Sequence, residues 1–156
     1  MIINTNSLLA SDLESLRRHK MTELICIYFG GFLTLFIAFY HTQLYSKLNW
    51  SEDFEKIDKS NAQIFYTINL ALTLFFASIG IISIIYAKEL CQAKGLAFGI
   101  CVLYSLFWGW RFIWQITYQR PNGEQPKPNT SKLIIPALIF SLYLLPVISK
   151  IYKSTL

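Results

Sequence analysis

The sequence predicts an all-α membrane protein: an antiparallel bundle of four transmembrane helices with a short interfacial helix in the first outer loop. Of its 156 residues, 54% are hydrophobic and only 15% are charged, which is too apolar for an ordinary soluble domain. The apolar residues gather in four stretches, 24–44, 64–87, 96–118 and 133–149. Because the connections are too short for a separate domain, we expect residues 1–156 to form a single integral membrane domain.

The length of each stretch supports a membrane span. A hydrocarbon core of ~30 Å takes about 20 helical residues at about 1.5 Å per residue. The first three stretches reach this length, and 133–149 is at the short end of the range. Pro136 falls near the opening turns of the last stretch, where proline is tolerated, whereas Pro146 is expected to kink the helix near its exit.

The polar segments flanking the first span are expected to lie at the lipid surface. Residues 1–23 form a leader with leucines at helical spacing and a basic end, which indicates a short interfacial helix. In the connection 47–63, Ser51 is the expected N-cap, and Trp50 and Phe54 fall on one face of a second short amphipathic helix. Ser60 has capping-box spacing for the next span, and residues 88–94 are expected to form a tight turn.

Small and polar residues recur at helical spacing in the first two spans. Such stripes face neighbouring helices, because close approach of two helices needs small side chains. The first stripe comprises Gly30, Thr34, Ala38 and His41. The second comprises Tyr66, Asn69, Thr73, Ala77 and Gly80. We expect both stripes to pack inside the bundle, with Asn69 in an interhelical hydrogen bond.

The third span carries Arg111 with no acidic residue in the same segment. Tyr104, Trp108 and Gln115 share its helical face, whereas Trp110 and Trp114 point elsewhere. An arginine inside a span costs about 2.5–3.5 kcal/mol on insertion scales, so it needs relief. Three interpretations stay open: the guanidinium snorkels to lipid phosphates, it is bound by internal polar groups, or it binds an anionic ligand.

In an antiparallel bundle, the end of the first span and the end of the third lie at the same membrane level as the start of the second. Six residues are therefore the hypothetical ligand-binding set: Arg111, His41, Asn69, Gln115, Trp108 and Tyr104. No catalytic residue and no metal ligand is assigned.

The distribution of Lys and Arg sets the expected orientation. Arg17, Arg18 and Lys20 precede the first span, which favours a cytoplasmic N-terminus, and an even number of spans returns the C-terminus to the same side. The three cysteines then map to the reducing half. We expect a bacterial inner (cytoplasmic) membrane.

Several function classes lack their motifs. There is no Cys-x-x-Cys for thiol oxidation, no His-Glu-x-x-His for zinc, no phosphate-binding Gly-Lys-Ser/Thr loop and no Gly-x-Ser-x-Gly elbow. A haem bundle needs histidines on facing spans, and only His41 qualifies. The basic residues are scattered, which argues against nucleic acid as a partner. No cofactor is expected.

The sequence favours a binding or accessory protein over an enzyme. Its outward-facing polar pocket, centred on Arg111, would take a lipid headgroup or another small anion. One alternative is a subunit of an oligomeric transporter or channel, and another is a membrane enzyme with His41 as general base. The expected partners are membrane lipids and an anionic small molecule, with a homo-oligomer or a partner membrane protein left open.

Overall fold

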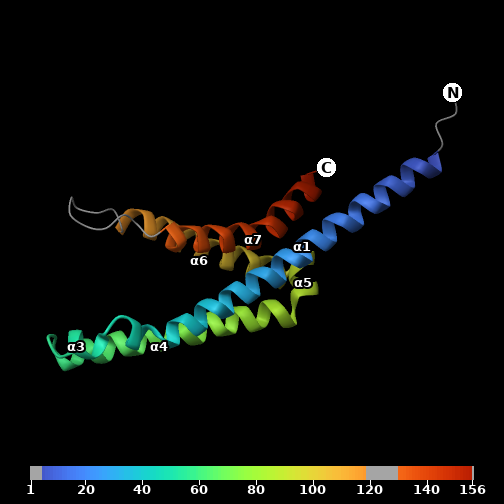
Figure 1. Ribbon diagram of the computed structural model, residues 1–156. Helices are drawn as coiled ribbons and strands as arrows, with labels where there is room; N and C mark the ends of the chain where they lie inside the picture. The colour runs from blue at the N-terminus through green and yellow to red at the C-terminus, as the bar shows by residue number, and fades with distance from the viewer. Residues whose placement is uncertain (1–4, 119–129, 156) are drawn as a thin grey trace. The chain divides into compact units, whose positions relative to one another are not determined.

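The computed structural model describes residues 5–118 and 130–155, and within these ranges the chain forms helices and no strand. Figure 1 shows the helices as ribbons. Their order is α1 (Thr5–Thr42), α2 (Leu44–Lys47), α3 (Trp50–Phe54), α4 (Lys59–Ile85), α5 (Ala87–Gln92), α6 (Leu96–Tyr118) and α7 (Thr130–Thr155). The prediction of an all-helical chain is confirmed.

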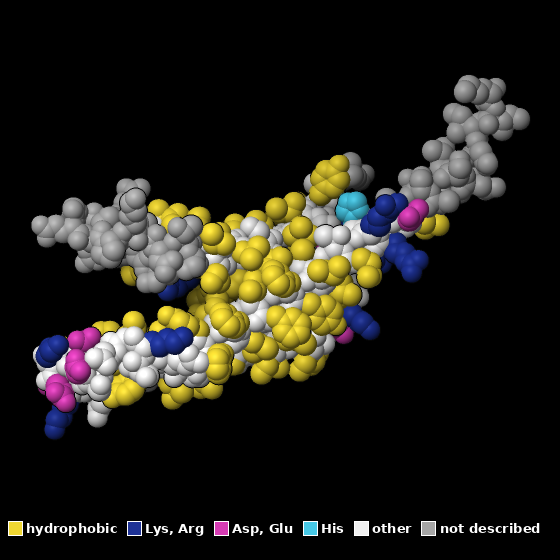
Figure 2. Space-filling view, viewed as in Figure 1, with side chains coloured by type: hydrophobic (Ala, Val, Ile, Leu, Met, Phe, Trp, Pro, Cys, Tyr) yellow, Lys and Arg dark blue, Asp and Glu magenta, His cyan; other side chains and the backbone are white. Residues whose placement is uncertain are grey.

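Four of these helices are long and apolar enough to cross a membrane. The apolar segments are Leu16–Thr42, Lys59–Ile85, Leu96–Thr117 and Leu133–Thr155. They overlap the four stretches read from the sequence, and large hydrophobic side chains cover their exposed faces (Figure 2). The protein is therefore a small multi-pass membrane protein.

The first helix is longer than the sequence indicated. The leader was expected to form a separate short helix, yet α1 continues without a break from Thr5 through the first span to Thr42. Residues 20–24 contain no glycine or proline, so nothing in the chain interrupts the helix at that point. Part of the predicted leader, residues 1–4, lies outside the described residues.

The short helices begin and end at other residues than expected. Trp50 begins α3 after Asn49, which has a left-handed backbone with φ 54°, and the expected N-cap Ser51 lies inside the helix. At the start of α4, the backbone N–H of Ser60 donates to Asp58 Oδ2 at 2.9 Å, so a carboxylate stabilises the helix start there. The expected turn 88–94 instead contains most of α5, and Ala93, the residue that follows the helix, has a left-handed backbone with φ 44°.

The chain divides into two units. One consists of Met1–Phe29 and Tyr86–Leu156, here called the terminal unit, and the other of Gly30–Ile85, here called the central unit. The division falls inside α1, so the first turns of that helix belong to the terminal unit and its later turns to the central unit.

In the central unit, α1 and α4 run side by side (Figure 1) and approach each other closely at two glycines. A Cβ on Gly80 would lie 2.5 Å from Leu35 Cγ and 2.9 Å from the backbone oxygen of Gly31. A Cβ on Gly31 would meet Ser83 Cβ at 3.0 Å. The crossing therefore depends on the missing side chains, as expected for membrane helices. The predicted stripe included Gly80, but its partner is Gly31 rather than Gly30.

In the terminal unit, α7 packs along α6 (Figure 1). Tyr143 is fully buried, and its ring meets that of Tyr104 edge-on at 5.2 Å between centroids. Phe140 covers Gly109, where a Cβ would lie 3.1 Å from the aromatic ring. These contacts fix which face of α6 is turned inward, and hence which polar residues of α6 are buried.

Hydroxyl side chains within the spans bond to the backbone of their own helix. Thr34 Oγ1 donates to the carbonyl of Gly30 at 2.8 Å, and Thr73 Oγ1 donates to that of Asn69 at 2.8 Å. Ser105 makes the same bond four residues back, at 2.8 Å. These groups are satisfied locally, so they do not need a partner on another helix.

Candidate functional site

The polar face of α6 is built as its spacing predicted. Tyr104, Trp108 and Gln115 are each at most 5% exposed, and Arg111, on the same face, is half-buried. Trp110 lies away from this face and is 55% exposed. The 3.6-residue helix period therefore places an arginine among buried aromatic and amide groups.

Arg111 has no carboxylate partner among the described residues of its unit. The ion pairs of the described chain join Arg18 to Glu14, Lys56 to Asp53 and Lys153 to Glu23. A guanidinium offers five N–H donors in a fixed plane and remains charged at all physiological pH values. Its chemistry therefore suits a planar or tetrahedral oxyanion.

His41 and Asn69 form a polar pair in the central unit. His41 Nδ1 and Asn69 Oδ1 are 3.0 Å apart, and the amide nitrogen of Asn69 donates to the backbone oxygen of His41 at 3.2 Å. Because an amide oxygen only accepts hydrogen bonds, this geometry places a proton on Nδ1. Phe76 packs against the imidazole with 5.0 Å between ring centroids. The expected interhelical hydrogen bond of Asn69 is therefore present and joins the end of α1 to α4.

The six predicted site residues divide between the two units. His41 and Asn69 belong to the central unit, whereas Tyr104, Trp108, Arg111 and Gln115 belong to the terminal unit. Each group is assembled within its own unit. The combined six-residue pocket stays a prediction.

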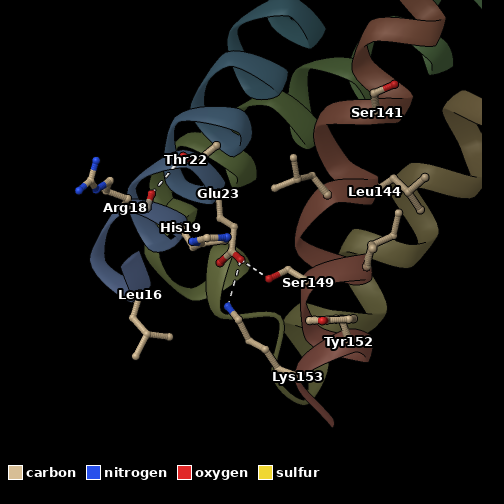
Figure 3. A pocket seen from close by; sticks show the side chains of 12 residues that line it. Leu16, Arg18, His19, Thr22, Glu23, Ser141, Leu144, Ser149, Tyr152 and Lys153 are labelled. Carbon is tan, nitrogen blue, oxygen red and sulfur yellow. Dashed lines mark hydrogen bonds and ion pairs between the residues drawn. The ribbon is translucent and has the colours of Figure 1, made fainter. Parts of the chain in front are cut away.

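A groove that the sequence did not indicate lies in the terminal unit, with a volume of about 890 Å³. One wall is the start of the apolar part of α1, and the other is the second half of α7 (Figure 3). Apolar side chains form most of the α7 wall, and polar ones gather near Glu23. The lining residues include Leu16, His19, Leu144, Leu145, Ile148 and Tyr152.

Glu23 is the buried polar centre of this groove. The residue is 5% exposed; Ser149 donates a hydrogen bond to Oε1, and Lys153 Nζ lies 3.4 Å from the same oxygen (Figure 3). Removing a carboxylate from water is costly unless its oxygens are bonded, and these two donors offset that cost. These two interactions join the first turns of the α1 span to the last turns of α7.

Sequence reasoning assigned Glu23 to the polar leader and so missed it. A signal was present, because Glu23 continues the buried stripe of Gly30, Thr34 and Ala38 backwards at the same helical spacing. Ile27, between Glu23 and Gly30, is fully buried on this face. The partners lie more than 120 residues away in the chain, and no local pattern connects them to Glu23.

The described residues offer little else for chemistry. They contain no group of three or more His, Cys, Asp or Glu side chains that could hold a metal ion. Cys26, Cys91 and Cys101 are free thiols. Comparison of the chain with protein-family models, with curated proteins and with solved structures found no match.

Proposed function

We propose that this multi-pass protein belongs to the binding or accessory class and takes a lipid headgroup or another small anion at Arg111. The observation that carries the proposal is a half-buried guanidinium inside an apolar span, without a carboxylate partner among the described residues of its unit. Arginines at membrane depth are costly and commonly mark ligand or ion sites. An oxyanion would supply the missing countercharge.

The direction of the side chain favours a ligand over snorkelling. Side chains on a helix lean toward its N-terminus, which for Arg111 is away from the nearer end of α6. Arg111 is about 10 Å of helix rise from Tyr118. Reaching lipid phosphates at that end would require the long side chain to reverse this lean, whereas an anion beside Trp108 or Tyr104, which precede Arg111 in α6, would not.

The proposed site also requires a particular arrangement of the four spans. We propose that the four spans form an antiparallel bundle with both termini in the cytoplasm of a bacterial inner membrane. Its pocket would open outward, with His41 and Asn69 orienting the anion opposite Arg111. The hydrogen bond between His41 and Asn69 supports this role, because it holds both side chains in fixed positions. A reporter enzyme fused after Leu156, active only in the cytoplasm, tests the orientation.

Two substitutions of Arg111 test the anion site. The full-length protein in detergent is melted with and without inorganic phosphate, and separately with phosphatidylglycerol. We expect one of these to raise the melting temperature of the unchanged protein. Arg111→Leu should abolish an increase caused by phosphate and lessen one caused by phosphatidylglycerol, and it should leave the ligand-free protein as stable or more stable, because a desolvated cation has been removed. Arg111→Lys should bind about tenfold more weakly, since the planar fork of donors is lost.

Arg17→Leu is the matched control for phosphate, because it removes an exposed arginine from α1 and should retain the full increase caused by phosphate. If Arg111→Leu responds to phosphate and to phosphatidylglycerol as the unchanged protein does, the arginine only snorkels and the proposal fails.

A further inference from the structure

The groove between α1 and α7 has a length and a polarity gradient that match one leaflet of a bilayer. Along α7 it extends from Lys153 back to Ser141, about 18 Å of helix rise. Half of a hydrocarbon core is about 15 Å. Leu144, Leu145 and Ile148 line the part of the groove farther from the C-terminal end of α7. Lys153 lies near that end and beside Glu23 of α1 (Figure 3). An amphiphile with one polar end therefore fits the groove better than a uniformly polar ligand.

The charges around the polar end of the groove favour an anion. Arg17, Arg18 and Lys20 of α1 and two lysines of α7 outnumber the three acids Asp12, Glu14 and Glu23 in the same segments. Arg18 borders the groove, but its guanidinium is directed away from it and pairs with Glu14 at 2.9 Å (Figure 3). Lys153 is consequently the cation that lies at the groove.

Lys153 is placed to bridge a buried carboxylate and an outside anion. Its ammonium group has three N–H donors, and only Glu23 engages it as an ion-pair partner among the described residues. The Lys153 side chain is 43% exposed, whereas that of Glu23 is 7% exposed. The buried carboxylate thus holds the ammonium at the groove, while the exposed side of the ammonium faces outward.

We infer that this groove is a binding site for an anionic phospholipid of the leaflet at which α1 begins and α7 ends. The phosphate contacts Lys153, and one acyl chain lies along Leu144, Leu145 and Ile148. This site is independent of the one proposed at Arg111, because the two share no residue. The groove binds the lipid through both the Lys153 charge and its apolar wall, so separate substitutions can remove each contribution.

Native mass spectrometry of the full chain, titrated with phosphatidylglycerol or phosphatidylcholine, tests the site. The unchanged protein should bind phosphatidylglycerol more tightly than phosphatidylcholine. Lys153→Gln should weaken phosphatidylglycerol binding about tenfold or more, because one charge-assisted hydrogen bond is lost. Lys153→Arg should retain the preference. Ile148→Trp, which fills the groove with an indole ring, should weaken binding of both lipids.

Each variant has a matched control on α7. Lys150→Gln removes a cation one turn away that does not line the groove, and Ile151→Trp adds an indole at an exposed position outside it. Both controls, and Arg111→Leu, should retain the phosphatidylglycerol preference. If Lys153→Gln binds as Lys150→Gln does, or Ile148→Trp as Ile151→Trp does, the inference is overturned. A melting curve of each lipid-free variant shows that it is folded.

Discussion

Replacing Gly80 by alanine should destabilise the protein, although alanine is the better helix former. The new Cβ would lie 2.5 Å from Leu35 Cγ and 2.9 Å from the Gly31 carbonyl oxygen. The leucine can rotate, but the backbone oxygen can move only if α1 and α4 separate. Overpacking of this kind costs about 1–3 kcal/mol. Relief of the glycine penalty within a helix returns roughly 1 kcal/mol, so we expect a net loss of about 1 kcal/mol, rising to about 2 kcal/mol.

Gly99 provides the matched control, because a Cβ at this position in α6 meets nothing within 4 Å. Gly99→Ala should stabilise the protein by about 0.4–1 kcal/mol. The two variants should therefore differ by roughly 2 kcal/mol, or about 5 °C in melting temperature for a chain of this size. Thermal unfolding in one detergent, followed by circular dichroism, measures the difference. Equal melting temperatures for Gly80→Ala and Gly99→Ala would show that the two helices do not approach as closely as described.

Three further predictions concern polar groups. Asn69→Leu should lower the unfolding free energy by about 0.6 kcal/mol, and by up to about 2 kcal/mol, because it removes the hydrogen bonds to α1. Thr67→Val should cost less, since the Thr67 hydroxyl bonds to the backbone of its own helix. Glu23→Gln should lower the unfolding free energy by about 1 kcal/mol or more, while Glu14→Gln, which breaks an exposed pair, should change it by less than about 0.5 kcal/mol. Burial raises the pKa of the Cys91 thiol above its ordinary value, and the nearby Glu23 carboxylate raises this pKa further. The thiolate fraction at pH 8 is therefore reduced, and the rate of maleimide labelling, measured in a variant without the other two cysteines, should still be rising at pH 9.

Specific results would contradict each of these. Equal costs for the asparagine and threonine variants would mean that the pair between α1 and α4 contributes nothing to stability. Equal costs for the two glutamate variants would mean that the Glu23 carboxylate lies in solvent. A labelling rate that reaches half of its maximum at about pH 8.5, as for a free thiol, would mean that the pKa of the Cys91 thiol is not raised.

Much of the fold could be predicted because each membrane span is determined by the residues of one continuous stretch of sequence. Four apolar stretches and a 3.6-residue period were enough to locate the long helices and to identify Trp108 and Gln115 as buried and Trp110 as exposed. The close approach of α1 and α4 was anticipated from Gly80, but which neighbouring glycine it meets depends on the rotation of the helix, and adjacent residues differ by about 100° in that rotation.

The candidate sites were harder to predict, because they depend on contacts between distant parts of the chain. An interhelical hydrogen bond was expected for Asn69, but the sequence did not indicate that His41 is its partner. Glu23 was assigned to the leader, since nothing near it in the sequence indicates that Ser149 and Lys153 surround it. The helix ends were predicted least accurately. The helix α3 begins after Asn49 and not after Ser51, and Asp58, rather than Ser60, supplies the side chain that bonds to the start of α4.

The hydroxyl groups bonded to their own helices bear on how the chain enters a bilayer. A threonine whose proton is held by a carbonyl one turn back has less hydrogen-bonding capacity left unsatisfied in lipid, so transfer from the insertion machinery is easier than a hydropathy scale implies. Thr34, Thr73 and Ser105 then resemble valine or alanine in effect, and they add little polarity to their spans.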